Sequence, residues 1–231
     1  MQIHGFNKTT LLDYPRHLAA TVFLGGCNMR CPFCHNASLV AGVVSQPTIP
    51  EQEVLSYLAK RKGILEGVCI TGGEPTLHPN LITFIKKIKE LGLKVKLDTN
   101  GTNPQLLKTL VTDRLIDYIA MDIKNSKEKY SQTAGLNHFN IDPILESADF
   151  LLTSPIEYEF RTTIVKEYHS REDMLSIGGW LTGAQAYYLQ SYEDSGEILL
   201  PGLHSHNRET LHEYVKLLTP MIPSVSVRGI V

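Results

Sequence analysis

LAATVFLGGCNMRCPFCHN, residues 18–36, joins a short apolar run to a loop that holds three of the chain's four cysteines. The apolar run, Leu18–Leu24, has the length of a buried β-strand. The cysteine loop follows this strand at once. In α/β proteins the chemistry collects at the carboxyl ends of parallel strands, so the stretch points to that fold class and to a reactive loop.

Short apolar runs alternate with helical patterns along the chain, except for an irregular stretch between the fourth and fifth runs. Such alternation predicts right-handed βαβ units and a parallel sheet. Six units are too few for a closed eight-fold barrel, so we expect an α/β fold, a partial, open (β/α)6 barrel with parallel strands. The predicted strands are Leu18–Leu24, Val68–Thr71, Leu93–Asp98, Leu115–Asp122, Tyr158–Val165 and Ala186–Gln190. The predicted helices are Pro50–Lys62, Asn80–Leu91, Pro104–Thr112, Arg171–Leu181 and Asn207–Leu218.

Polar motifs stand at the carboxyl ends of these strands. Because such ends meet at one edge of a parallel sheet, we expect a single mouth to collect them. The motif residues are Cys27, Gly72, Gly73, Glu74, Asp98, Thr99, Asn100, Gly101, Asp122 and Lys124, with Arg161 inside the fifth strand.

The composition is that of an ordinary soluble globular domain. The chain has 231 residues, 42% of them hydrophobic and 20% charged, with a formal net charge of −2. We expect one domain over residues 1–231, with no bias toward nucleic acid or an anionic membrane. The start, MQIHGFNKTTLLDYP, lacks the pattern of a signal peptide, and no apolar run reaches the roughly 18 residues of a membrane span. The expected location is the cytoplasm.

Three cysteines within eight residues, Cys27, Cys31 and Cys34, indicate metal ligation rather than a disulfide scaffold. Thiolates suit iron–sulfur clusters and zinc, and three of them can hold a 4Fe–4S cluster with its fourth iron open. A zinc site would need His35 or Cys69 as its fourth ligand. His35 adjoins Cys34 too closely, and Cys69 lies inside a predicted strand, where it packs as a small apolar residue. A ferredoxin would need a fourth thiolate nearby.

The cysteine loop, with Phe33 before its last cysteine, resembles the signature of the radical S-adenosylmethionine enzymes. Ile70–Pro75, ITGGEP, is similar to the glycine-glycine-glutamate motif of that superfamily, which contacts the amino group of the bound methionine moiety. The resemblance implies that a 4Fe–4S cluster binds S-adenosylmethionine at its open iron. Reductive cleavage then yields methionine and a 5′-deoxyadenosyl radical.

Within that superfamily the sequence is most similar to the activases of glycyl-radical enzymes. Leu97–Gly101, LDTNG, and Met121–Lys124, MDIK, resemble stretches of those activases. The likeness runs from LLDYP at Leu11–Pro15 through YEFRTTIV to VRG near the end of the sequence. It is strongest to the activating proteins of anaerobic ribonucleoside-triphosphate reductase.

This resemblance implies a protein substrate and an electron donor. The substrate is a glycyl-radical enzyme, anaerobic ribonucleotide reductase by the strongest likeness, from one glycine of which the radical takes a hydrogen atom. The donor is of flavodoxin or ferredoxin type. Many activases carry extra cysteine pairs in a ferredoxin-like insert, and none is expected here because Cys69 alone is left over.

The resemblance also implies contacts with the cofactor. Glu74 accepts hydrogen bonds from the amine of S-adenosylmethionine, and Gly72 and Gly73 let the backbone approach it. Asn100 and Phe33 belong to the same set of contacts. The alternative for the Gly-Gly-Glu-Pro stretch is a simple turn.

Two cations are placed to bind the carboxylate of S-adenosylmethionine. They are Lys124 and Arg161, since Arg suits bidentate contact with a carboxylate. The alternative is a salt bridge from these cations to a nearby acid such as Glu159.

Four oxygen-bearing positions are expected to form a site for a monovalent cation, as the resemblance implies. The ligands are the carboxylates of Asp98 and Asp122 and the backbone oxygens of Thr99 and Met121. Asp98 and Thr99 are also expected cofactor contacts. In the alternative interpretation Asp98 caps the following turn and Asp122 pairs with Lys124.

Two rival functions remain. The first is a radical S-adenosylmethionine enzyme that acts on a small molecule, such as a deazaguanine-forming synthase. The second is a non-catalytic iron–sulfur or zinc module that binds a partner. One departure from the pyruvate formate-lyase activating enzyme is also relevant: that enzyme has a His near its sixth strand where this chain has Tyr192, and no role is transferred to the tyrosine.

Overall fold

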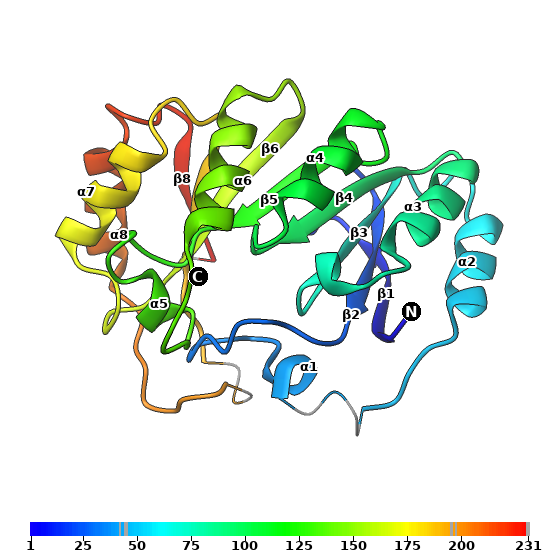
Figure 1. Ribbon diagram of the computed structural model, residues 1–231, viewed down its shortest axis with the longest axis horizontal. Coiled ribbons are helices and arrows are strands. Elements are labelled where there is room, and N and C mark those ends of the chain that lie inside the picture. Colours follow the sequence, from blue (N-terminus) through cyan, green and yellow to red (C-terminus); the bar gives the residue numbers. More distant parts are fainter. Residues whose placement is uncertain (42, 44–45, 195, 197, 230–231) are drawn as a thin grey trace. The chain divides into compact units, whose positions relative to one another are not determined.

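The computed structural model describes residues 1–41, 43, 46–194, 196 and 198–229 (Figure 1). The chain divides into two compact units. The first unit comprises Met1–Asn28 and Ser38–Ala120, and the second comprises Met29–Ala37 and Met121–Val231.

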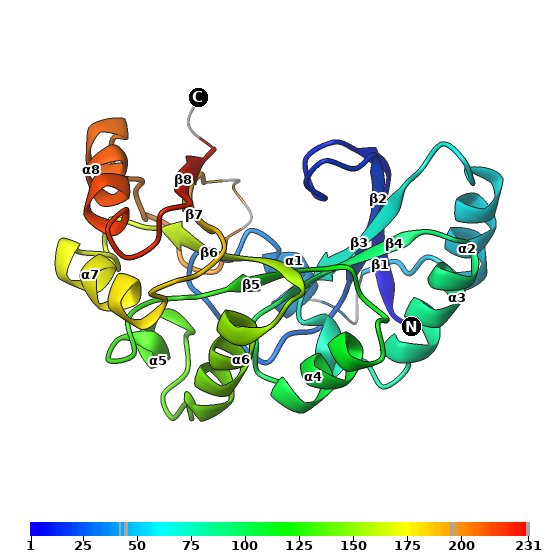
Figure 2. The same cartoon turned by 90° about the horizontal axis from the view of Figure 1, so that it is seen from above.

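The first unit is built on four strands, β1 (Ile3–Thr10), β2 (Ala19–Leu24), β3 (Gly67–Gly72) and β4 (Lys94–Thr99). The β1 and β2 strands form an antiparallel hairpin, and β2, β3 and β4 are parallel. Helix α3 (Leu81–Glu90) packs on β4 and beside α2 (Glu51–Lys60), as Figure 2 shows. The helical segments of this unit are α2 (Glu51–Lys60), α3 (Leu81–Glu90), α4 (Pro104–Thr112) and the short 3-10 turn η2 (Pro75–Leu77), and α1 (Ala37–Ala41) begins at the unit boundary.

The core of the first unit follows from side-chain periodicity. Helix α3 buries Leu81, Phe84, Ile85 and Ile88, the i, i+3, i+4, i+7 spacing of one helix face. In β3 and β4 the register pairs Val68 with Val95 and Ile70 with Leu97, and all four side chains are fully buried. The alternate positions carry polar groups. Cys69 pairs in register with Lys96, both are buried, and Cys69 packs inside its strand as expected.

The second unit contains three parallel strands, β6 (Glu157–Ile164), β7 (Tyr187–Ser191) and β8 (Val225–Arg228). Its helices are α5 (Tyr130–Thr133), α6 (Asp142–Thr153), α7 (Arg171–Trp180) and α8 (Arg208–Leu218). Helices α7 and α8 pack side by side (Figure 1). Strand β5 (Tyr118–Asp122) crosses the boundary between the units, and the strand order of the sheet is β1 through β8.

The expected α/β fold with an open, mostly parallel sheet is confirmed, and all six predicted strands and five predicted helices are present. The number of strands was wrong by two, because β1 and β8 were missed. The sequence of β1, IHGFNKTT, is mostly polar, and β8 has four residues, so neither shows the apolar run of a buried strand. Helix α6, DPILESADFLLT, lies in the stretch that had no regular pattern.

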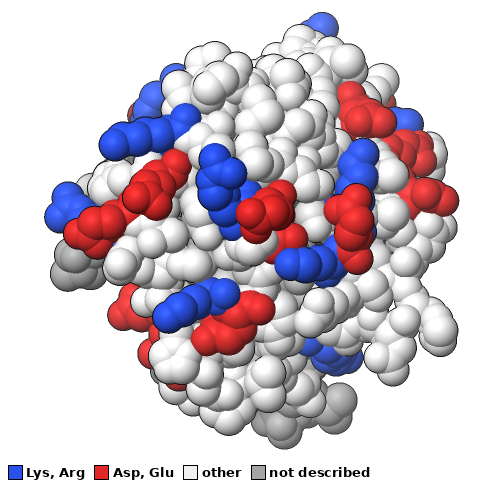
Figure 3. Space-filling view, turned by 90° about the vertical axis from the view of Figure 1, so that its left-hand side faces the viewer, with Lys and Arg blue, Asp and Glu red and all other residues white. Residues whose placement is uncertain are grey.

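Charge and hydropathy add two observations. On the face drawn in Figure 3, Lys and Arg side chains lie beside Asp and Glu side chains, without a wide area of one sign among the residues drawn. Within the described ranges, no helix is long and apolar enough to span a membrane.

Candidate functional site

The cysteine loop lies where the chain passes from one unit to the other. Cys27 belongs to the first unit, and Cys31 and Cys34 belong to the second. Cys31 is buried, while Cys27 and Cys34 are partly exposed. None of these three, nor Cys69, forms a disulfide.

In the first unit, backbone contacts fix the segment before Cys27. The Gly73 N–H donates to Leu24 O, and the Glu74 N–H donates to Gly26 O, each at 2.8 Å. A Cβ atom on Gly73 would lie 1.9 Å from Gly26 O, so only glycine permits this approach. The Gly-Gly-Glu stretch therefore packs directly against the segment that leads into the cysteine loop.

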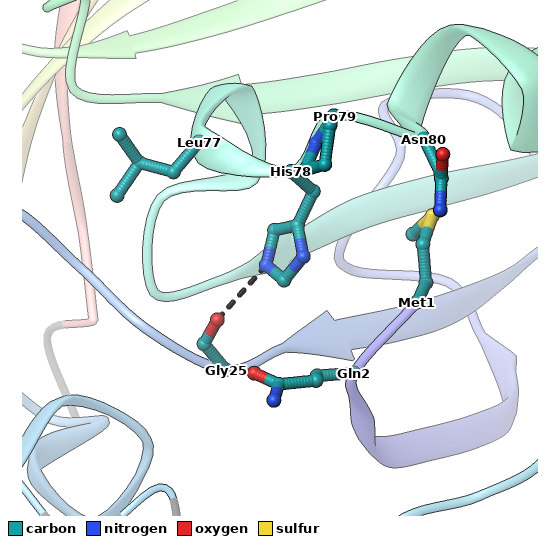
Figure 4. Close-up of a pocket in the computed structure, with 7 residues that line it drawn as sticks. All are labelled: Met1, Gln2, Gly25, Leu77, His78, Pro79 and Asn80. Atoms are coloured by element: carbon teal, nitrogen blue, oxygen red, sulfur yellow. Dashed lines mark hydrogen bonds between the residues drawn. The ribbon is translucent and has the colours of Figure 1, made fainter.

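His78 holds the same segment from another side. Its Nε2 donates to Gly25 O at 2.9 Å, as Figure 4 shows. Burial lowers the pKa of His78, although the bond to Gly25 opposes this, so the ring is neutral at neutral pH. The pocket drawn in Figure 4 is lined by Met1, Gln2, Gly25, Leu77, His78, Pro79 and Asn80.

Glu74 is fully buried and its carboxylate accepts four hydrogen bonds from the first unit. Oε1 accepts from the Thr76 N–H (3.0 Å), the Thr76 hydroxyl (2.6 Å) and the Thr99 hydroxyl (2.8 Å). Oε2 accepts from the Asn100 N–H at 2.6 Å. Burial raises the pKa of Glu74, and the four donors oppose this. Glu74 thus joins the end of β3 to the end of β4, and its contact with the cofactor amine stays a prediction.

Asn100 extends this network to a cysteine. Its Nδ2 lies 3.9 Å from Cys27 Sγ and 2.9 Å from Asn28 Oδ1. Its Oδ1 accepts from the N–H and the hydroxyl of Thr102, at 3.0 and 2.7 Å. Asn100 is therefore the described link between the carboxyl end of β4 and the first cysteine of the loop.

In the second unit, Asp122, Lys124 and Arg161 form one charged cluster. The Arg161 Nε and the Lys124 Nζ donate to Asp122 at 2.9 and 3.0 Å. Burial raises the pKa of Asp122, but the two cations outweigh it and lower that pKa to about 2. Burial likewise disfavours the charge on Lys124, but the attraction of Asp122 and Cys31 is stronger and raises its pKa. The alternative acid, Glu159, instead pairs with Arg228 in a bidentate bridge at 2.7 and 2.8 Å.

Phe33 and Tyr192 lie in an apolar cluster of the second unit, together with Val165 and Leu203. The Tyr192 ring also lies edge-on to His35, with 6.0 Å between ring centroids. The Tyr192 hydroxyl is buried and has no hydrogen-bond partner among the described residues. A buried hydroxyl without a partner costs free energy.

The four expected cation ligands divide between the units. Asp98 and Thr99 belong to the first, and Met121 and Asp122 to the second. Asp98 forms an ion pair with the buried Lys96, and Asp122 pairs with Lys124 and Arg161. In the described ranges, no three His, Cys, Asp or Glu side chains are arranged to hold a metal ion. Occupation of a cation site stays a prediction.

His169 was missed by the sequence analysis. It is fully buried, its Nδ1 accepts from the Val165 N–H at 3.0 Å, and its Nε2 donates to Lys124 O at 2.9 Å. Burial lowers its pKa, so the neutral ring fixes the backbone of Lys124. No local pattern marks this residue, because its partner Lys124 is 45 positions away.

Comparisons with known proteins identify the family of this chain. Residues 21–175 match the family model described as the radical SAM superfamily. The chain is 30% identical to the "Putative glycyl-radical enzyme activating enzyme MJ1227" of Methanocaldococcus jannaschii, over 99% of this chain and 96% of that protein. It is 27% identical to the pyruvate formate-lyase-activating enzyme of Clostridium pasteurianum, over 64% of this chain and 63% of that one.

Solved structures show the same fold. The crystal structure of Streptococcus suis SuiB bound to S-adenosylmethionine matches with a TM-score of 0.69 and 16% identity, over 90% of this chain. The match spans 52% of SuiB, so about half of that protein lies outside it. Enzymes of the superfamily use a 4Fe–4S cluster and S-adenosylmethionine. The chain belongs to the radical SAM superfamily and, within it, to the glycyl-radical enzyme activating enzymes.

Proposed function

We propose that this protein activates anaerobic ribonucleotide reductase by taking a hydrogen atom from one of its glycines. The observation that carries the proposal is the relationship to an activating enzyme over 99% of this chain. The choice of reductase rests on the motifs that span the sequence, from LLDYP to VRG. Both units would then serve one radical SAM domain over residues 1–231, in the reducing cytoplasm and without a ferredoxin-like insert.

The three loop cysteines fit a 4Fe–4S cluster by donor chemistry. They are thiols, and soft thiolates are the donors that such clusters require. The fourth thiol, Cys69, is fully buried within β3 and faces Lys96 at 3.7 Å, so it is not a candidate ligand. Cys27, Cys31 and Cys34 would therefore hold three irons.

The second unit supports binding of S-adenosylmethionine. Asp122, Lys124 and Arg161 together carry a net charge of +1, so a ligand carboxylate placed against them would be attracted. The Tyr192 hydroxyl, which has no partner among the described residues, would offer a hydrogen bond to a polar ligand group. Asp122 and His169 orient the two cations through hydrogen bonds to Lys124 and Arg161 and to the Lys124 backbone.

When bound, the cluster and S-adenosylmethionine supply one-electron chemistry that ends in removal of a hydrogen atom from the substrate. This sequence has four cysteines and thus no set of thiols for a second cluster. The electron would therefore come from a separate flavodoxin- or ferredoxin-type protein.

The test is electron paramagnetic resonance on the reduced protein, mixed anaerobically with the reductase and S-adenosylmethionine. A glycyl-radical doublet should appear, and it should be absent with the Cys34→Ala variant or with a reductase whose acceptor glycine is changed to alanine. Cleavage of S-adenosylmethionine without a radical on the reductase would overturn the choice of partner. If pyruvate formate-lyase and other glycyl-radical enzymes of the same cell also show no glycyl-radical signal, the proposal of a protein substrate gives way to that of a small-molecule substrate.

A further inference from the structure

We propose that the Asn100 side chain tunes the iron–sulfur cluster through an N–H···S hydrogen bond to Cys27, and that Glu74 is the positioning residue that holds Asn100 in place. The inference rests on the proposed function in one respect: Cys27 must be a cluster ligand. It assigns Glu74 an internal task, in addition to the expected contact with a cofactor amine.

The orientation of the Asn100 amide is determined by its neighbours. Its oxygen accepts from the N–H and the hydroxyl of Thr102, which are both donors, so the amide nitrogen must face the other way. That nitrogen carries two hydrogens. Asn28 Oδ1 accepts one at 2.9 Å, and Cys27 Sγ, 3.9 Å from the nitrogen, is the acceptor for the other.

The Asn100 backbone is held by Glu74. Glu74 Oε2 accepts from the Asn100 N–H, and Glu74 Oε1 accepts from the Thr99 hydroxyl. The same Thr99 oxygen accepts from the Gly101 N–H at 3.1 Å, so three consecutive residues are connected to one carboxylate. Asn100 is 5% exposed and Glu74 0%, which leaves little freedom for either.

Glu74 also contacts the backbone of the residue that precedes Cys27. Its own N–H donates to Gly26 O at 2.8 Å, directly before the cysteine. The contacts therefore close a ring within the first unit, from Gly26 through Glu74 and Asn100 to Cys27. A ring of hydrogen bonds holds the donor and the sulfur together better than either bond alone.

A donor aimed at a cluster sulfur stabilises negative charge on it. The reduced cluster carries one more negative charge than the oxidised cluster, so such a donor raises the reduction potential. Removal of the Asn100 donor should therefore shift the potential to more negative values. Iron content should not change, because Asn100 is not a ligand.

The experiment compares Asn100→Asp with wild type, each reconstituted anaerobically without S-adenosylmethionine. Aspartate keeps the shape and the acceptor for Thr102 but loses the N–H donor and adds a negative charge, which by itself lowers the potential. Asn100→Leu is therefore the second variant, because leucine loses the donor without adding a charge. The matched control is Asn103→Asp, since Asn103 caps α4 from the same segment and contacts the Leu106 N–H and Thr76 O rather than Cys27. Readouts are iron per chain, the spectrum of the reduced cluster, and its potential by redox titration. We expect full iron in all three variants, and a negative shift in Asn100→Asp and in Asn100→Leu but not in Asn103→Asp.

Glu74→Gln tests the positioning role. Glutamine puts either an oxygen or an NH2 group where four donors converge, so the ring must rearrange. The reduction potential of the cluster in Glu74→Gln should shift in the same direction as in Asn100→Asp. In the double variant, Glu74→Gln with Asn100→Asp, the potential should shift no further than in the single variant with the larger shift. Glu74→Asp should restore the potential only in part, because aspartate keeps the carboxylate on a side chain that is one methylene shorter.

The outcomes separate two failures. An unchanged potential in Asn100→Leu at full iron content overturns the inference, even if Asn100→Asp shifts, and leaves the proposed function intact. Full iron in Cys27→Ala overturns the ligand assignment itself.

If Glu74→Gln weakens S-adenosylmethionine binding without changing the reduction potential, Glu74 acts on the cofactor alone and its positioning role is wrong. If Glu74→Gln does not fold, the Asn100 pair still decides the hydrogen bond, and Glu74→Asp then decides the positioning role.

Discussion

Two carboxylates, one in each unit, have opposite surroundings: the Glu74 side chain is fully buried, and the Asp122 side chain is 30% exposed. Glu74 in the first unit accepts four hydrogen bonds from neutral donors, and burial raises its pKa. Asp122 in the second unit lies between Arg161 and Lys124, which lower its pKa to about 2. Neutral donors satisfy a carboxylate and leave no positive charge behind. Two cations around one carboxylate leave a charge of +1, which suits a second anion. The first arrangement therefore suits an internal anchor, and the second suits a ligand site.

The largest expected effect comes from the three thiols of the cysteine loop. Replacing Cys27, Cys31 or Cys34 with alanine should abolish the cluster, because a cluster that loses one of three ligands is not retained. Iron analysis of anaerobically reconstituted protein measures this, with about four irons expected in wild type. Cys69→Ala is the control and should keep its iron. Full iron in a triple variant of the loop would rule out the cluster.

The next effect concerns the cations of the second unit. Lys124→Met and Arg161→Met should weaken binding of S-adenosylmethionine by roughly 10- to 100-fold, since a hydrogen bond to a charged group contributes about 1.5–3 kcal/mol. Anaerobic calorimetry on the cluster-loaded protein measures the affinity. Glu74→Gln is the comparison and should lose less, because its partners are internal. A larger loss of affinity in Glu74→Gln than in Lys124→Met or Arg161→Met would contradict the assignment of Glu74 as the internal anchor and of Asp122 as part of the ligand site.

The pH dependence of stability tests the same contrast. The pKa of Asp122 falls from 3.8 to about 2 on folding, so its pairing stabilises the fold above the unfolded value and this contribution is lost as the pH falls toward 2. The expected size is about 2 kcal/mol. In urea unfolding from pH 6 to pH 2, Asp122→Asn should lose less stability over this range than wild type.

The contribution of Glu74 to stability changes with pH in the opposite direction to that of Asp122. Its raised pKa means that folding disfavours the charged form, so protonation as the pH falls through the folded pKa favours the native state. Glu74→Gln should therefore remove a stabilising trend toward acid, whereas Asp122→Asn removes a destabilising one. Identical pH profiles for the two variants would contradict the assignment of their surroundings.

The smallest effect is expected at Tyr192. Its buried hydroxyl has no partner among the described residues, so Tyr192→Phe should leave stability within about 0.5 kcal/mol of wild type or raise it. If the hydroxyl contacts a ligand, the same variant should weaken S-adenosylmethionine binding several-fold without affecting iron content. A clear loss of stability would mean that the hydroxyl has a structural partner.

The fold and the cluster ligands were predicted from local sequence patterns. The strand and helix alternation depends on periodicities of a few residues, and the spacing of Cys27, Cys31 and Cys34 lies within eight positions. The stretch before the cysteines, LAATVFL, already has the form of β2. Strands without an apolar run, β1 and β8, were missed for the same reason, since the signal that finds the others is absent from them.

Which groups meet was decided by the tertiary structure. Glu74 and Asn100 are 26 positions apart, Asp122 and Arg161 are 39 apart, and Glu159 and Arg228 are 69 apart. A residue type and its place near a strand end indicate what chemistry is available. Strand register and the loops that follow the strands determine which partner each charge has. The sequence by itself therefore determined the superfamily and the order of elements, and it predicts the cysteine ligands. Only the folded chain decided that Glu74 is satisfied by neutral donors and that Asp122 is shared by two cations, because those contacts join segments that no local pattern connects.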